Sequence, residues 1–137
     1  METEELVDRL REIGLERTHL EVKSGAGGCP TSIRETLSAF SNKGGGTILI
    51  GLSEPDFKPV QIDVAVVRDG LSRMMRDDIE PALQGDIAIE TLANGARIIR
   101  LDVDEIDSVS KPCFVKTKGQ YGGSYIRTGD GDYRLKD

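Results

Sequence analysis

The chain has 137 residues and a formal net charge of −6, from 18 Lys and Arg against 24 Asp and Glu. A single domain of this length buries roughly two-thirds of its unfolded surface, so it folds without disulfides or a structural metal. The acidic balance excludes a protein that coats nucleic acid by net attraction, because affinity for phosphate comes mainly from Lys and Arg.

The cysteines and the N-terminus indicate a cellular compartment. Cys29 and Cys113 have no metal-ligand spacing, and one pair is weak support for an oxidising compartment. The first ten residues are acidic and amphipathic, without the apolar core of a signal peptide, and no apolar run reaches ~18 residues. We therefore expect a soluble, cytoplasmic protein with reduced thiols and no membrane partner.

The first part of the chain predicts a helix followed by a strand. Residues 3–13 carry apolar side chains at helical spacing, namely Leu6, Leu10 and Ile13, and Gly14 suits a C-terminal stop. Residues 19–24 alternate, with Leu20 and Val22 on one face and polar or charged side chains on the other. This alternation predicts a strand with one solvated face.

A second helix and a central strand come next. Ser32 and Glu35 fit the capping box, in which the N-cap side-chain oxygen and the side chain of a Glu three residues later each accept from the other residue's backbone N–H. Gly44 supplies a left-handed stop to this helix, whose apolar stripe is Ile33, Leu37 and Phe40. The dense apolar run at residues 48–50 predicts a central strand buried on both faces, and a buried helical piece is the alternative.

The second half predicts a helix and a hairpin. Asp63 can cap the helix, and Pro81 ends it because the residue before proline disfavours the helical conformation. Residues 87–92 and 97–103 flank Asn94-Gly95, which predicts a hairpin with a type I′ turn.

Two more short strands, at residues 114–116 and 124–127, complete the predicted elements. No linker or internal repeat divides residues 1–137. We therefore expect an α+β fold: a single compact domain with a mixed sheet and about three helices.

Acidic residues near the first strand suggest metal-dependent chemistry. Glu16 and Glu21 could bind a divalent cation and orient a water for phosphodiester hydrolysis, while Lys23 stabilises charge on the phosphate. A third carboxylate would come from Glu54 or Asp56, which follow the central strand. Alternating charges also arise routinely on a solvated strand face, so both interpretations stay open at this point.

Basic and aromatic side chains gather between residues 111 and 129, a segment without any Asp or Glu. Aromatic rings among cations can stack bases while the cations hold phosphates. The candidates are Lys111, Lys116, Lys118, Tyr121, Tyr125 and Arg127. Tyr125 equally fits a partly buried strand residue.

Two glycine-rich segments have alternative interpretations. The loop at residues 25–28 precedes a helix N-terminus that suits an anion, but it fails the Walker A and G-x-G-x-x-G patterns, which favours a flexible connection. The glycines at residues 44–46 fit a helix cap and a tight turn. Functionally, Gly45 and Gly46 would let a nucleic-acid backbone approach their amides.

Together these motifs resemble the Schlafen AlbA-type domain over nearly the whole chain. The resemblance includes Glu16, L-E-V-K at residues 20–23, Lys111-Pro112 and Y-I-R-T-G at residues 125–129. Its most specific part is an A-F-x-N-x-x-G-G-x-I-x-I-G-like core, formed by Ala39, Phe40, Asn42, Gly45, Gly46, Ile48, Ile50 and Gly51. The resemblance implies a compact α+β domain with a nucleic-acid-binding role, DNA being favoured, and no cofactor.

In bacteria such domains usually form the N-terminal part of longer transcriptional regulators, with an ATPase-like region and a winged helix behind. The resemblance therefore implies that residues 1–137 are a domain excised from a longer protein. Comparison with AlbA-type domains also suggests a homodimer.

Animal Schlafen proteins carry a related core that cleaves tRNA and rRNA with a metal held by three acids. Glu16 and Glu21 match two of these acids, and Lys23 matches the accompanying lysine. The third falls where this chain has Ser53-Glu54, so Glu54 would have to replace it. The alternatives to DNA binding are thus a ribonuclease that holds Mg²⁺ or Mn²⁺ with Glu16, Glu21 and Glu54, and a protein-interaction or dimerisation module, which fits the acidic charge.

Overall fold

Residues 1–135 are described by a computed structural model of the chain; Lys136 and Asp137, the end of the expected domain, lie outside the described residues. Two 3₁₀ turns occur at Ser108–Ser110 and Lys116–Lys118. The helices and strands are α1 (Thr3–Glu12), β1 (Leu20–Lys23), α2 (Ile33–Asn42), β2 (Gly46–Ile50), α3 (Val64–Asp77), β3 (Ile79–Glu80), β4 (Ile87–Thr91), β5 (Arg97–Val103), β6 (Phe114–Val115), α4 (Gly119–Gly122), β7 (Tyr125–Thr128) and β8 (Gly131–Arg134).

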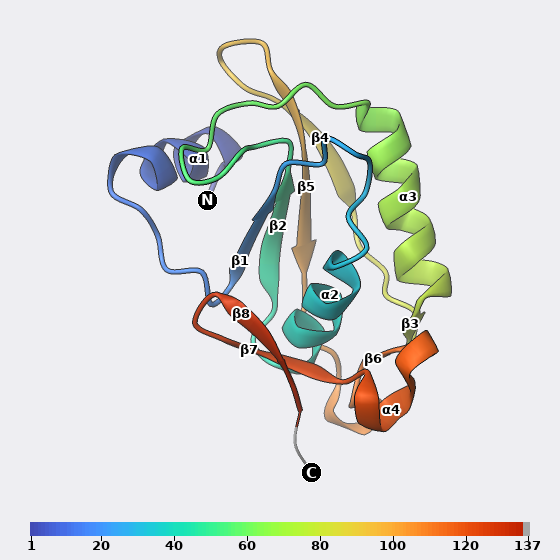
Figure 1. The fold of residues 1–137 in the computed structure, drawn as a ribbon. Coiled ribbons are helices and arrows are strands. Elements are labelled where there is room, and N and C mark those ends of the chain that lie inside the picture. The colour runs from blue at the N-terminus through green and yellow to red at the C-terminus, as the bar shows by residue number, and fades with distance from the viewer. Residues whose placement is uncertain (136–137) are drawn as a thin grey trace.

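A four-stranded sheet with the order β1-β2-β5-β4 forms the centre of the domain (Figure 1). β1 and β2 are parallel, and β5 is antiparallel to β2 and β4, so the sheet is mixed as predicted. In β2, the side chains of residues 48–50 are fully buried. This confirms the predicted central strand, because a strand with neighbours on both edges and helices on both faces has no polar alternation.

Two hydrophobic cores lie on opposite faces of this sheet. On one face, α2 and α3 pack against Ile48, Ile50 and Ile99. On the other face, α1 packs against Val22 and Leu49. No helix within residues 1–135 combines the length and the apolar character that crossing a membrane requires.

The first helix ends earlier than predicted. α1 stops at Glu12, and the side chain of Ile13 is 75% exposed, so its predicted place in the apolar stripe is wrong. The stripe consists of Leu6, Val7 and Leu10. A stripe broader than one residue per turn is typical of a helix that lies flat on a sheet.

The predicted capping box of α2 is also wrong. Ser32 has helical φ and ψ, and its side chain makes no cap hydrogen bond. The chain already turns before this residue, so main-chain carbonyls of residues 30–32 accept from the N–H groups of residues 33–35. By contrast, Asp63 caps α3 as predicted, accepting from the Val66 N–H at 3.2 Å.

The hairpin between β4 and β5 is confirmed, but its turn is not type I′. Only Gly95 has positive φ (88°) in this turn, whereas type I′ requires positive φ at both central residues. The Leu92 N–H donates to the Ala96 carbonyl at 2.7 Å, and the Gly95 N–H donates to the Leu92 carbonyl at 2.8 Å. The connection therefore holds three residues and needs a single left-handed one.

The C-terminal segment forms no strand of the central sheet. β6 pairs with β3 and β7 pairs with β8, in two small antiparallel sheets. Figure 1 shows β7 and β8 lying across one end of β1, β2 and α2, with α4 next to β6. β3 and β8 are absent from the sequence-based prediction, because strands of two and four residues with mostly polar side chains give little hydrophobic periodicity.

Buried polar side chains of α2 hold this segment in place. The Asn42 amide donates to the carbonyls of Cys113 and Tyr125, both at 2.9 Å, and its oxygen accepts from the Cys113 N–H at 2.7 Å. The Ser38 hydroxyl donates to the Cys113 carbonyl at 2.7 Å and accepts from the Tyr125 N–H at 2.9 Å. These bonds replace the ladder that β6 and β7 would have in a large sheet.

We predict that Asn42→Ala lowers the free energy of unfolding by about 2 to 4 kcal/mol, because it leaves buried main-chain groups at Cys113 and Tyr125 without partners. Urea denaturation followed by circular dichroism measures the change. The matched control is Asn94→Ala in the exposed hairpin turn, where the same substitution should cost under about 1 kcal/mol. Equal losses for the two variants would contradict the role assigned to Asn42.

Candidate functional site

Arg127 of β7 is the centre of a buried ion cluster beside β1. Its side chain is 2% exposed and lies over the Phe40 ring, 5.4 Å from the ring centroid. The guanidinium donates to the carbonyls of Arg17 and Leu20 at 3.0 and 2.9 Å. It also donates to the carboxylate of Glu21 at 2.7 Å and, through its other Nη, to Asp132 at 3.0 Å.

This arrangement keeps the guanidinium charged and inaccessible. Burial lowers the pKa of Arg127, but hydrogen bonds with Glu21 and Asp132 outweigh burial and raise it. The N–H donors of Arg127 thus already have partners within the protein, and its role in nucleic-acid binding stays a prediction.

Thr36 and Asp132 belong to this cluster, and sequence reasoning missed both. The Thr36 hydroxyl donates to Asp132 at 2.7 Å, which ties α2 to β8. No motif in the sequence singles out either residue. Their proximity depends on a contact between positions 96 residues apart.

We predict that Arg127→Met lowers the free energy of unfolding by about 3 to 5 kcal/mol, because it leaves the carboxylates of Glu21 and Asp132 without their cation. Thermal and urea denaturation measure the loss. Arg134→Met, at an exposed position of β8, is the matched control and should change stability by at most about 0.5 kcal/mol. The double variant Arg127→Met, Glu21→Gln should recover part of the loss, and its failure to do so would contradict the assigned ion pair.

The structure does not bring the three predicted metal ligands together. Glu21 is bound to Arg127 and lies 3.3 Å from the Lys23 ammonium. Glu54 forms an ion pair with Arg17 at 3.0 Å, and Glu16 accepts from a neighbouring threonine hydroxyl. Within residues 1–135 no three His, Cys, Asp or Glu side chains are grouped as metal ligands.

Mg²⁺ and Mn²⁺ require several oxygen ligands in regular geometry, so this donor set does not fit such an ion. The geometry therefore gives no support to a metal-dependent ribonuclease built from Glu16, Glu21 and Glu54. Lys23 forms an ion pair with Glu21 on the α2 face of β1. This face was predicted to be solvated, but both of its charged residues are half-buried.

The three lysines of the basic segment each meet an acid from another part of the chain. Their ion pairs join Lys111 to Glu105 at 2.6 Å, Lys116 to Glu80 at 3.7 Å and Lys118 to Glu35 at 2.8 Å. The charge asymmetry seen along residues 111–129 is therefore partly cancelled in space.

In two of these pairs the pKa of one member, Lys118 or Glu105, is shifted. The hydrogen bond to Glu35 raises the pKa of Lys118, with a further contribution from the Tyr125 hydroxyl. The hydrogen bond from Lys111 lowers the pKa of Glu105, and the Gly44 N–H adds to this effect. Lys118 and Glu105 are thus charged at neutral pH.

Of the two interpretations of Tyr125, the structure confirms the buried strand residue. Its side chain is 6% exposed, and its hydroxyl lies 2.8 Å from the Lys118 ammonium. A ring buried in this way offers no free face for a base in this arrangement, and the predicted nucleic-acid contact of Tyr125 stays a prediction. Tyr121 in α4 is 78% exposed and remains available for stacking.

Gly45 and Gly46 pack against the protein itself. A Cβ at Gly45 would lie 2.5 Å from the Val103 carbonyl oxygen, and one at Gly46 would lie 2.5 Å from the Phe40 ring. Gly45 also has φ of 68°. The tight-turn interpretation explains both glycines, because their neighbours leave no room for a side chain at either position.

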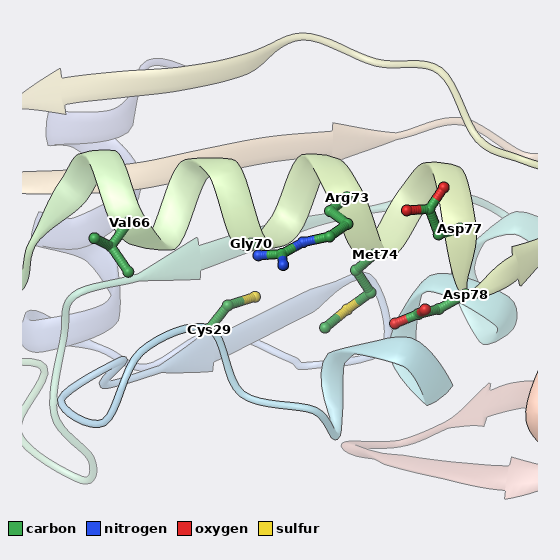
Figure 2. A pocket seen from close by; sticks show the side chains of 7 residues that line it. All are labelled: Cys29, Val66, Gly70, Arg73, Met74, Asp77 and Asp78. Carbon is green, nitrogen blue, oxygen red and sulfur yellow. The ribbon is translucent and has the colours of Figure 1, made fainter.

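A groove of about 410 Å³ lies between α3 and the loop that carries Cys29 (Figure 2). Cys29 faces Gly70, where a Cβ would come within 3.0 Å of the Cys29 Cβ. The absence of a side chain at Gly70 therefore allows the loop to approach the helix. Arg73, Met74, Asp77 and Asp78 line the rest of the groove with Val66.

Both thiols are poor nucleophiles. Burial raises the pKa of Cys29, although the Arg73 charge opposes this rise, and burial raises the pKa of Cys113 to about 11. Only the thiolate reacts, so neither position resembles a catalytic cysteine.

We predict that Cys113 resists alkylation by iodoacetamide at pH 8 until the protein is unfolded, because its side chain is buried and its thiolate fraction is about one in a thousand. Cys29 should react more slowly than free cysteine. Mass spectrometry of the alkylated peptides, with and without urea, measures both rates. Rapid labelling of Cys113 in the folded protein would contradict its burial.

The fold and the α2 motif together define an α+β domain of the Schlafen type. The family model "Schlafen, AlbA_2" matches residues 16–136, and the chain belongs to this family. The predicted family resemblance and the predicted α+β fold are thereby confirmed.

Two solved structures are similar to this chain. One is the solution NMR structure of the N-terminal domain of a Nitrosomonas europaea protein described as related to the ATP-dependent DNA helicase RecG; it is 26% identical, covers 99% of this chain and 94% of that chain, and has a TM-score of 0.75. The crystal structure of the DIP2311 protein from Corynebacterium diphtheriae is 16% identical, with a TM-score of 0.64, and shows the fold alone. That match covers 86% of this chain and 25% of the DIP2311 chain. A search of curated proteins finds no match.

Proposed function

We propose that this domain binds nucleic acid, with DNA favoured, as the recognition part of a transcriptional regulator. The family and the structural likeness support a nucleic-acid-related function. The observation that carries the proposal is the match over nearly both whole chains to the N-terminal domain of a protein described as related to a DNA helicase. DNA as the ligand and regulation as the role go beyond that likeness.

The surface that fits a phosphate backbone best is the end of the domain formed by the turn at 116–118 and α4. Lys116 and Lys118 lie on this turn, and the exposed Tyr121 follows in α4. Exposed ion pairs contribute only about 0 to 1 kcal/mol each, so a phosphate can replace Glu80 or Glu35 as the partner of these lysines. A base can then stack on the Tyr121 ring.

The acidic partners set a limit on affinity. With a net charge of −6 and a carboxylate beside each lysine, binding should be weak and strongly dependent on salt. This expectation separates the domain from proteins that carry an unpaired basic patch.

We predict that Lys116→Gln, Lys118→Gln weakens the binding of a labelled DNA duplex and reduces the slope of log K against log salt by about 2, one unit for each lost phosphate contact. Fluorescence anisotropy at several salt concentrations measures the slope, with single-stranded RNA as a second probe. The matched control is Lys58→Gln, Arg97→Gln, which makes the same change of charge at exposed positions beside another groove.

A complementary variant tests the role of the acids. Glu35→Gln, Glu80→Gln frees both lysines and should strengthen DNA binding, whereas Glu5→Gln, Glu12→Gln on α1 should have a smaller effect. Absence of salt-sensitive binding to either probe in the micromolar range would refute the proposed function. If the control Lys58→Gln, Arg97→Gln weakens binding as much as Lys116→Gln, Lys118→Gln does, the interface lies elsewhere on the domain.

A further inference from the structure

The two edges of the central sheet differ in whether their backbone groups are satisfied. At the β1 edge, the N–H groups of Thr47 and Gly51 donate to the carbonyls of His19 and Lys23. Because alternate residues of β1 face β2, the N–H and carbonyl groups of Leu20 and Val22 point away from the sheet. The carbonyl of Leu20 accepts from Arg127 at 2.9 Å, and its N–H donates to the Arg17 carbonyl. Arg127 therefore closes part of this edge against strand addition.

The opposite edge, formed by β4, is open. The Leu92 N–H donates to the Ala96 carbonyl. Because hydrogen-bonded pairs alternate along an antiparallel ladder, the backbone N–H and carbonyl groups of residues 88 and 90 point toward β5. Ile87, Ile89 and Thr91 consequently point their N–H and carbonyl groups away from the sheet. Within residues 1–135, none of these outward groups has a hydrogen-bond partner.

β4 lacks several of the features that protect an exposed edge, and its one charged side chain is Glu90. It carries no Lys, no Pro and no bulge, and it pairs with β5 over its whole length of five residues. Ile87 and Ile89 pack toward the core beneath α3. α3 lies beside β4 and contacts it (Figure 1), while the outward backbone groups of β4 stay unbonded within residues 1–135.

The other face of β4 borders an acidic hollow beside the N-terminus of α1. The acids that line it and form no ion pair within residues 1–135 are Glu2, Glu4, Asp86 and Glu90. The one basic side chain of the lining, Arg100, is already paired with Asp102 at 3.2 Å. A strand added to β4 would therefore place every second side chain next to a field of negative charge.

We propose that the outer edge of β4 binds an extended, basic segment of a partner protein as a fifth strand. The outward groups of Ile87, Ile89 and Thr91 supply the main-chain hydrogen bonds, and the acidic hollow selects Lys or Arg at alternate positions of the segment. A second copy of this chain fits the edge less well, because pairing β4 with β4 would bring two acidic hollows together. The surface is separate from the lysines assigned to DNA, so the two proposals can fail independently.

We expect a nine-residue peptide of alternating Lys and Val to bind the domain with micromolar affinity and to slow hydrogen exchange at the amides of Ile87, Ile89 and Thr91. Isothermal titration calorimetry and NMR of the labelled protein measure these effects. A peptide of alternating Glu and Val is the control and should not bind. Ile89→Pro removes an outward N–H without breaking a bond to β5 and should abolish binding, whereas Ile89→Val should preserve it.

The charge requirement has its own matched pair of variants. Asp86→Asn, Glu90→Gln should weaken binding of the Lys and Val peptide about tenfold, and Glu12→Gln, Asp56→Asn should leave it nearly unchanged. The proposal is overturned if the peptide does not bind, or if it binds without protecting the three amides. It is also overturned if light scattering shows a dimer in which these amides are already protected, because a second copy then occupies the edge.

Discussion

The structure depends on a short set of hydrogen bonds between α2 and the C-terminal segment. Asn42 and Ser38 point from α2 into the space where β6 and β7 begin, and their side chains satisfy main-chain groups of Cys113 and Tyr125. A segment with such short strands has little apolar area of its own to bury. Buried polar groups that find partners with good geometry can fix one arrangement of the chain, because any other arrangement would leave those groups unsatisfied.

This arrangement explains why the most specific family motif lies on α2 and the turn behind it. Phe40 forms the floor under the Arg127 guanidinium, Asn42 holds the C-terminal segment, and Gly46 leaves room for the Phe40 ring. Each of these residues acts through packing or hydrogen bonding within the domain. A motif that is specific to a family therefore need not mark the place where a ligand binds.

The same contacts determine which charges reach the surface. Arg127 and Glu21 neutralise each other next to β1, while the lysines at the other end of the C-terminal segment stay exposed beside single carboxylates. Negative charge collects at the hollow beside β4, where Arg100 is the one basic side chain and pairs with Asp102. The domain thus presents a weakly basic end and a strongly acidic edge, and a protein with both can contact two kinds of partner at once.

The sequence by itself determined the three long helices, the central strand, the β4–β5 hairpin and the α+β class, because each depends on hydrophobic periodicity or turn residues within about fifteen positions. Only the tertiary structure decided which partners the charged and polar side chains have and which of these side chains are buried. Glu21 and Arg127 are 106 positions apart, and Lys118 and Glu35 are 83 apart, so no local pattern indicates that they pair. Burial of Tyr125, closure of the β1 edge and the open β4 edge likewise follow from which strands are neighbours, and strand order is a long-range property that periodicity does not encode.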